Sequence, residues 1–196
     1  MASALDNQNI SYITAHGEGA FYGPKIDLHV KDAIGRRWQL STIQVDFSQP
    51  DNFELQYVDS NNKRIKPVMI HRALLGSIER FTGILIENYA GHFPGWLAPV
   101  QVKILTIGEV SNYVEEIVKS LKNVRLEIDD RSTRLGEKIH DASKEKVPVS
   151  IIIGENDVNL RTMALNIYSQ DNQKDIKLED GIKQIKSLLK VPKFKL

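Results

Sequence analysis

Apolar and polar positions along the chain predict two parts with different architectures. In residues 26–31, apolar side chains alternate with charged or polar ones, and this period of two is typical of a half-buried strand. Residues 36–47 continue in the same way after a turn at residues 32–35, so the two strands are expected to pair antiparallel. Apolar residues spaced by three or four from Leu74 to Tyr89 then predict an amphipathic helix that begins just after His71.

In the second part, short apolar runs alternate with segments of helical spacing. This order implies right-handed crossovers and a sheet covered on both faces. Pro94 and Pro99 interrupt both patterns and suggest a boundary between them. The predicted fold class is therefore α/β: an α+β part with an antiparallel sheet in residues 1–96, followed by an α/β domain in residues 97–196. The expected strands of this domain are 101–107, 124–128, 148–153 and 161–168, and its expected helices are 110–121, 135–145 and 178–189.

Composition narrows the function classes. The 196 residues are 41% apolar and 26% charged, with a net charge of +1 and no cysteine. Such values are typical of a soluble globular protein, and they exclude a disulfide scaffold, a thiolate zinc finger and a cysteine nucleophile within this chain. No apolar run could span a bilayer and no signal-like start is present, so cytoplasmic residence without a membrane partner is expected. The neutral balance argues against a generally basic nucleic-acid binder but permits a local basic face.

The local exception in charge is a lysine-rich tail with no acid among its basic residues, namely Lys183, Lys186, Lys190, Lys193 and Lys195. We interpret it as a solvated helix face and a frayed end. A phosphate-contacting patch is the alternative, and it gains weight only if a nucleic-acid site is argued independently.

The glycine-rich segment 17–25 does not fit a phosphate-binding loop. It lacks the Gly-Lys-Ser/Thr ending, and a strand follows it instead of a helix. Its glycines favour a tight loop or a close approach of the backbone to a ligand.

Residues 67–81 carry more chemistry. Arg72, Gly76 and Arg80 recur every four residues, which places them on one side of the predicted helix. A glycine there costs about 1 kcal/mol of helix stability, but it leaves room for a flat group over which Arg80 could lie. A packing glycine beside two surface arginines explains the spacing equally well. His71 alone does not indicate a metal site, because no paired histidine accompanies it.

Four segments, in this order, resemble the threonyl-tRNA synthetases: GEGAFYGPKID (17–27), WQLSTIQVDFSQP (38–50), PVMIHRALLGSIERF (67–81) and FPGWLAPVQV (93–102). The third segment is similar to the third signature motif of class II synthetases in its threonine-specific form. The resemblance extends over essentially the whole chain. It implies a parent activity that joins threonine to its tRNA with ATP and magnesium.

The resemblance implies a role for each motif residue in the catalytic part. Arg80 would stack on adenine and contact the phosphates, with Lys25 as a second catalytic cation. Tyr22 and Gln44 would border threonine. His71 would be one of three ligands of a zinc ion that reads the amino and hydroxyl groups of threonine, and thereby rejects valine. The remaining ATP-pocket residues would be Gln39, Thr42 and Gly76.

Residues 97–196 resemble the anticodon-binding domain of that family, an α/β unit with a mixed five-stranded sheet. Such a domain reads splayed-out bases by stacking and by hydrogen bonds to base edges. The expected anticodon-reading positions are Ser132, Lys146, Asp157 and Asn166, where the bacterial pattern has Asn, Arg, Glu and Arg. Lys146 and Asp157 keep the charge sign, whereas Ser132 and Asn166 do not preserve the chemistry.

Other parts of the family pattern have no counterpart in these 196 residues. They are the first two motifs, two zinc ligands and the editing domain, and the first motif forms the homodimer interface of the full-length enzyme. We therefore expect the C-terminal part of a synthetase that binds tRNA but is not catalytically competent alone. The alternative is a non-catalytic synthetase-like paralogue that holds tRNA or another partner, which the residues at 132 and 166 and the lysine-rich tail support.

Overall fold

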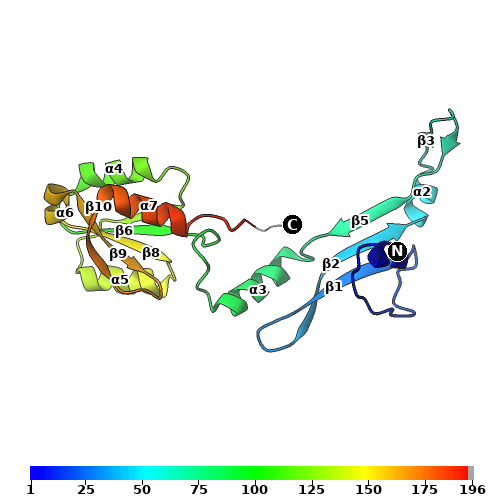
Figure 1. Ribbon diagram of the computed structural model, residues 1–196, viewed down its shortest axis with the longest axis horizontal. Helices are drawn as coiled ribbons and strands as arrows, with labels where there is room; N and C mark the ends of the chain where they lie inside the picture. Colours follow the sequence, from blue (N-terminus) through cyan, green and yellow to red (C-terminus); the bar gives the residue numbers. More distant parts are fainter. Residues whose placement is uncertain (194–196) are drawn as a thin grey trace. The chain divides into compact units, whose positions relative to one another are not determined.

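The computed structural model describes residues 1–193, which form two compact units, Met1–Asn88 and a second that begins at Tyr89. The first unit contains a three-stranded sheet in the order β1-β2-β5, with both pairings antiparallel (Figure 1). These strands are β1 (Lys25–Lys31), β2 (Arg37–Asp46) and β5 (Met69–Ala73). The expected antiparallel pair is thus confirmed. The other elements are α1 (Ala2–Asp6), α2 (Ser48–Asn52), the hairpin of β3 (Tyr57–Val58) and β4 (Arg64–Ile65), and α3 (Ile78–Tyr89).

The first unit buries few side chains. Within residues 1–88, only Leu40, Asp46 and Pro50 are buried. Leu28 on β1 and Ile70 on β5 are 55% and 64% exposed, although the alternating pattern assigns Leu28 to an inward face. Within residues 1–88, the sheet therefore lacks a layer that covers its apolar side chains.

The predicted start of α3 is wrong. His71 and Arg72 belong to β5, where they pair with Gln44 and Ile43 of β2, and the helix begins at Ile78. The reason is the turn at Gly76, which has a φ of +65° and approaches β2 so closely that a Cβ would lie 2.8 Å from the carbonyl oxygen of Leu40. Such a turn favours glycine and ends the strand before the helix can begin. Arg72, Gly76 and Arg80 therefore do not share one side of a helix.

The second unit contains the expected mixed five-stranded sheet, in the order β10-β9-β8-β6-β7. The β6 strand pairs parallel with β7 and β8, while β9 pairs antiparallel with β8 and β10. The elements are β6 (Val102–Thr106), α4 (Ser111–Ser120), β7 (Leu126–Asp129), α5 (Leu135–Lys144), β8 (Val149–Ile153), α6 (Glu155–Leu160), β9 (Thr162–Ile167), β10 (Gln173–Lys177) and α7 (Leu178–Leu188). Two of these, α6 and β10, have no counterpart among the elements expected from the sequence.

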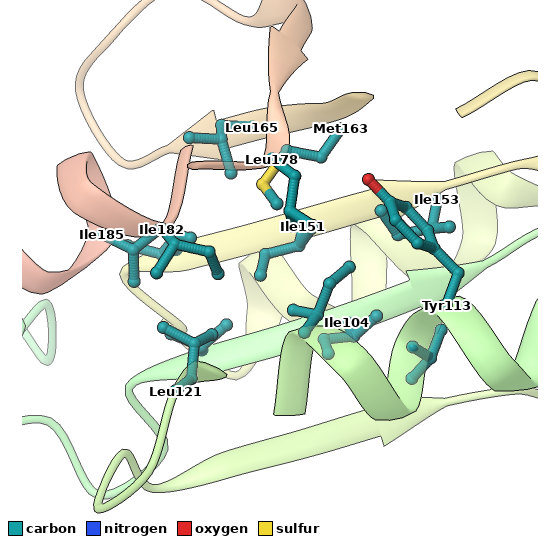
Figure 2. Packing of buried hydrophobic residues seen from close by; sticks show 14 of the residues in the cluster. Ile104, Tyr113, Leu121, Ile151, Ile153, Met163, Leu165, Leu178, Ile182 and Ile185 are labelled. Atoms are coloured by element: carbon teal, nitrogen blue, oxygen red, sulfur yellow. The ribbon is translucent and has the colours of Figure 1, made fainter. Parts of the chain in front are cut away.

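The core of the second unit lies between the sheet and the helices α4 and α7. Figure 2 shows Ile104 and Ile151 of the central strands close to Tyr113 of α4 and to Ile182 and Ile185 of α7. Helix α5 lies on the opposite face of the sheet (Figure 1). Because helices cover both faces, β6 and β8 are nearly continuous apolar runs, as expected for buried parallel strands.

Helix α7 buries Ile182 and Ile185, and it exposes Lys183 and Lys186 on its other side. These two lysines of the tail thus lie on a solvated face, whereas Lys195 lies outside the described residues. Over residues 1–193, no helix combines the length and apolar character needed to cross a membrane.

Candidate functional site

A hollow of about 370 Å³ opens beside the sheet of the first unit. The β2–β5 register places His71 directly opposite Gln44. Asp46 lies two residues after Gln44 and therefore on the same face of β2. The loop before β1 adds Tyr22 to the wall. The lining residues are Phe21, Tyr22, Gln44, Asp46, Ser48, Gln49, Asn52 and His71.

Asp46 holds the His71 ring in place. Its Oδ2 lies 2.8 Å from Nε2 of His71, and its Oδ1 accepts the backbone N–H groups of Ser48 and Gln49 at 2.8 and 2.9 Å. Burial alone would raise the pKa of Asp46, but hydrogen bonds from Gln49, His71 and Ser48 outweigh it and the pKa lies below its ordinary value. The carboxylate is thus negatively charged and accepts a hydrogen bond from Nε2 of His71, so Nδ1 is the ring nitrogen that Asp46 does not engage.

The glycine-rich loop brings Tyr22 to the same wall. Its backbone lies so close to β2 that a Cβ at Gly23 would lie 2.1 Å from the carbonyl oxygen of Val45. The hydroxyl of Tyr22 donates to Oε1 of Gln44 at 2.6 Å, and its ring meets His71 edge-on at 6.1 Å. The loop therefore packs against the protein's own sheet and brings together Tyr22, Gln44 and His71, three of the residues expected at the site.

The two expected catalytic cations, Lys25 and Arg80, have different partners. The ammonium of Lys25 lies 2.5 Å from Oδ2 of Asp27, and this hydrogen bond raises the pKa of Lys25. Arg80 is exposed, donates to the carbonyl oxygen of Gln39 at 3.4 Å, and has its guanidinium 5.9 Å from the centre of the Trp38 ring. Trp38 is a contact that the sequence analysis missed.

The remaining ATP-pocket residues line up along β2. The turn at Gly76 lies against the backbone of Leu40 on β2. Gln39 directly precedes Leu40 on this strand, and Thr42 lies two residues after Leu40. Thr42 lies directly opposite Asp27 on β1. Burial would raise the pKa of Asp27, but hydrogen bonds from Lys25 and Thr42 outweigh it and the pKa lies below its ordinary value. The roles of these residues toward adenine stay predictions.

The described part of the chain does not contain a complete metal site. No group of three His, Asp or Glu side chains in residues 1–193 is arranged to hold an ion. His71 fits as a single ligand, because a ligating histidine commonly donates its other ring N–H to a carboxylate as His71 does to Asp46.

The four expected anticodon-reading positions lie at two different ends of the second sheet. Lys146 follows α5 just before β8 begins, and Asn166 on β9 pairs with Ser150 near the same end. Ser132 follows the carboxyl end of β7, and Asp157 in α6 follows the carboxyl end of β8.

The side chain of Asp157 is fully engaged within the chain. Its Oδ2 accepts the N–H of Gly154 at 2.9 Å, and its Oδ1 accepts the hydroxyl of Thr162 at 3.0 Å. These bonds stabilise the start of α6. Lys146 and Asn166 are therefore the better-placed pair for contacts with a partner.

Two further residues, which the sequence analysis missed, lie beside that pair. The rings of His92 and Tyr168 stack with centroids 3.7 Å apart and planes 13° apart, and Nζ of Lys146 lies 3.0 Å from Nε2 of His92. Burial, and then the charge of Lys146, lower the pKa of His92. No motif or spacing links these residues, because His92 and Tyr168 are far apart in the sequence.

The segment that carries Ser132 is fixed by a charge network. Arg131 donates to both carboxylate oxygens of Asp129, at 2.6 and 2.8 Å, and to Asp141 at 2.7 Å. These hydrogen bonds from Arg131 hold the pKa of Asp129 at about 2. The ammonium of buried Lys138 donates to the carbonyl oxygens of Thr106 and Asp129, and so ties β6 to β7.

Comparisons with known proteins agree with this division of the chain. Residues 3–89 match the tRNA synthetase class II core domain (G, H, P, S and T), and residues 101–188 match an anticodon binding domain. Threonine–tRNA ligases of Clostridium botulinum and Acetivibrio thermocellus are 45% and 47% identical to the chain over 97% of its length. The chain spans 31% and 30% of the length of these relatives.

A solved structure supports the same assignment. The RNA binding domain of threonyl-tRNA synthetase from Cryptosporidium parvum is 32% identical, with a TM-score of 0.79, over 95% of this chain and 48% of that one. The chain thus belongs to the class II aminoacyl-tRNA synthetases, as a part of the catalytic core followed by an anticodon-binding domain, with threonine–tRNA ligases among its relatives.

Proposed function

We propose that this chain supplies the motif-three part of the threonine-activation site and the tRNA-binding domain of a threonine–tRNA ligase. The observation that carries the proposal is the hollow in which Tyr22, Gln44 and the Asp46–His71 pair converge. In the proposed reaction, the carboxylate of threonine attacks the α-phosphate of magnesium-bound ATP and displaces pyrophosphate. A hydroxyl of the terminal ribose of the tRNA then attacks the threonyl carbonyl and displaces AMP.

The side chains of this hollow suit a small polar amino acid. Tyr22 and Gln44 would hydrogen-bond its amino and hydroxyl groups, while Arg80 and Lys25 would stabilise the negative charge of the phosphates. His71, held by Asp46, would be one ligand of the zinc ion. When bound, zinc would contact the hydroxyl of threonine. Valine has no hydroxyl and would leave this polar contact unmade, so the site would reject it.

Several finer points stay predictions from the resemblance. They are the zinc ion, magnesium–ATP, the homodimer of the full-length enzyme and cytoplasmic residence. We further propose that the chain alone does not activate threonine, because residues 1–193 contain no group of three side chains that could hold the zinc ion. Threonine-dependent exchange of pyrophosphate into ATP by the isolated chain would contradict this.

A chimera tests the proposed activity. Residues 1–196 would replace the corresponding C-terminal part of the Clostridium botulinum relative, and threonine-dependent pyrophosphate exchange would be measured. We expect exchange in the chimera, and a loss of at least about 100-fold in the variants Gln44→Ala and His71→Ala. The variant His29→Ala, at an exposed position on β1, serves as the matched control. A folded chimera without exchange would refute the assignment.

A second candidate is a non-catalytic synthetase-like paralogue that holds tRNA or another partner. It is favoured by the engagement of both carboxylate oxygens of Asp157 within the chain and by Ser132 and Asn166 at two anticodon-reading positions. For such a paralogue we expect no exchange in the chimera, but binding of tRNA by the chain itself.

A further inference from the structure

The end of β9 presents an aromatic side chain that the fold does not require for its core. Ile167 is buried against the core, so the side chains on either side of it, Asn166 and Tyr168, face the side of the sheet that carries α5. The backbone N–H of Tyr168 donates to the carbonyl oxygen of Pro148 at 3.0 Å. The backbone position of Tyr168 is therefore fixed by the β8–β9 pairing.

His92 supports Tyr168 from one side. The two rings are nearly parallel at 3.7 Å, yet Tyr168 is still 52% exposed. Apolar surface stabilises a fold when it is buried, so a residue that stays half exposed contributes less to folding than a buried one. The exposed side of Tyr168 is thus a flat, preorganised surface.

The surroundings of this pair are polar and positively charged. Lys146 donates to Nε2 of His92 at 3.0 Å, which places an ammonium group at the edge of the stack. Below the rings lies a hollow of about 60 Å³ lined by His92, Ile139, Ser143, Val147, Ser150, Asn166 and Tyr168. That is the room of roughly two water molecules at about 30 Å³ each. A large planar ligand would therefore lie on the outer face of Tyr168, not in the hollow.

A nucleobase fits these three features together. Unstacked bases bind RNA-binding proteins by stacking on aromatic rings, with neighbouring cations on the phosphates and amides on the base edges. Lys146 and Asn166 offer the cation and the amide, and Tyr168 offers the ring. We propose that the Tyr168–His92 pair is a stacking platform for one unpaired base of the tRNA anticodon loop. This inference rests on the proposed tRNA-binding function of the second unit.

The test is a titration of the full chain with a threonine-specific tRNA. Loss of the ring in Tyr168→Leu is expected to weaken binding by about 5- to 100-fold, the range measured for removal of one stacked base contact. Tyr168→Phe keeps the ring and is expected to stay within about twofold. The matched control is Tyr57→Leu, because Tyr57 is a similarly exposed tyrosine at 51%, and its replacement should leave affinity unchanged.

Two further measurements make the result decisive. With a tRNA that lacks the anticodon stem-loop, Tyr168→Leu and the unsubstituted chain should bind equally. With 5-iodouridine in the anticodon loop, light should crosslink the unsubstituted chain at Tyr168, which tests the platform even if a variant fails to fold. A full effect of Tyr168→Leu without the stem-loop, or crosslinks only at other residues, would overturn the inference.

The proposed function can fail separately. If Lys146→Ala weakens tRNA binding while Tyr168→Leu and Tyr168→Phe do not, the platform is wrong and tRNA binding stands. If the unsubstituted chain does not bind tRNA, the proposed binding function is wrong and the platform falls with it.

Discussion

Replacement of Lys138 by methionine tests how the ends of β6 and β7 are held beneath the segment that carries Arg131 and Ser132. Lys138 is 2% exposed, and its ammonium donates to the carbonyl oxygens of Thr106 and Asp129 at 2.8 and 3.1 Å. Methionine has a similar length but cannot donate. The hydroxyl of Thr106 still reaches the Asp129 carbonyl at 3.3 Å, so the main loss is at the carbonyl of Thr106.

The expected cost follows from these contacts. Each buried carbonyl group that loses its donor costs about 1–3 kcal/mol, and one or two such groups are affected. The Asp129 carboxylate also loses the attraction of the Lys138 ammonium. Methionine carries no charge, so the cost of burying the Lys138 ammonium disappears, and this offsets part of the loss. We therefore expect Lys138→Met to lower the free energy of unfolding of the second unit by about 2–4 kcal/mol.

Urea unfolding in a Trp38→Phe background measures this cost, because Trp96 then reports on the second unit alone. Lys144→Met, at an exposed position on the same helix, is the control and should change stability by less than about 0.5 kcal/mol. A cost of Lys138→Met below about 1 kcal/mol would refute the reasoning that buried carbonyl groups depend on this lysine.

Two other predictions concern the same unit. In α7, Gly181→Ala should lower the free energy of unfolding of the second unit by about 1–3 kcal/mol, because the new Cβ would lie 2.5 Å from Sδ of Met163. In α5, the new Cβ of Gly136→Ala would meet no atom within 4 Å, so this variant should raise the free energy of unfolding by up to about 1 kcal/mol. Thermal unfolding of both variants checks the contrast, and equal shifts would contradict it. Because the pKa of Asp129 is lowered from 3.8 to about 2, its contribution of about 2 kcal/mol should be present above pH 4 and lost as the pH falls toward 2. Urea titrations at several pH values should show this loss in the unsubstituted chain but not in Arg131→Gln, and an equal loss in both would contradict the assignment to Arg131.

Much of the second unit could be predicted from the sequence because its sheet is covered on both sides. The apolar runs of β6 and β8 reflect burial on two faces, and the spacing of Ile182 and Ile185 reflects one buried side of α7. The strand β10 (QKDIK) was missed, because an edge strand with few buried side chains carries no apolar period.

The start of α3 shows where periodicity fails. The strand-like residues of β5 run directly into the helical spacing, and the turn between them depends on the approach of Gly76 to Leu40, a contact between distant segments. In the candidate site, the resemblance implies roles toward threonine for Tyr22, Gln44 and His71, and these three residues line one hollow. The roles themselves stay predictions. Asp46 was missed because its partner His71 is on another strand, and pairs across strands leave no local pattern.

The most direct test of the account is the affinity of the 196-residue chain for two tRNAs that differ only in the anticodon. The chain would be titrated with threonine-specific tRNA and with the same tRNA carrying a foreign anticodon, at one fixed salt concentration because phosphate contacts make affinity salt-dependent. Stacking on Tyr168 tolerates any base, so a preference for the native anticodon would come from hydrogen bonds to base edges. If the second unit makes such hydrogen bonds, the native anticodon should bind at least about fivefold more tightly, the equivalent of one hydrogen bond worth about 1 kcal/mol. Equal dissociation constants for the two tRNAs would contradict anticodon reading by this chain.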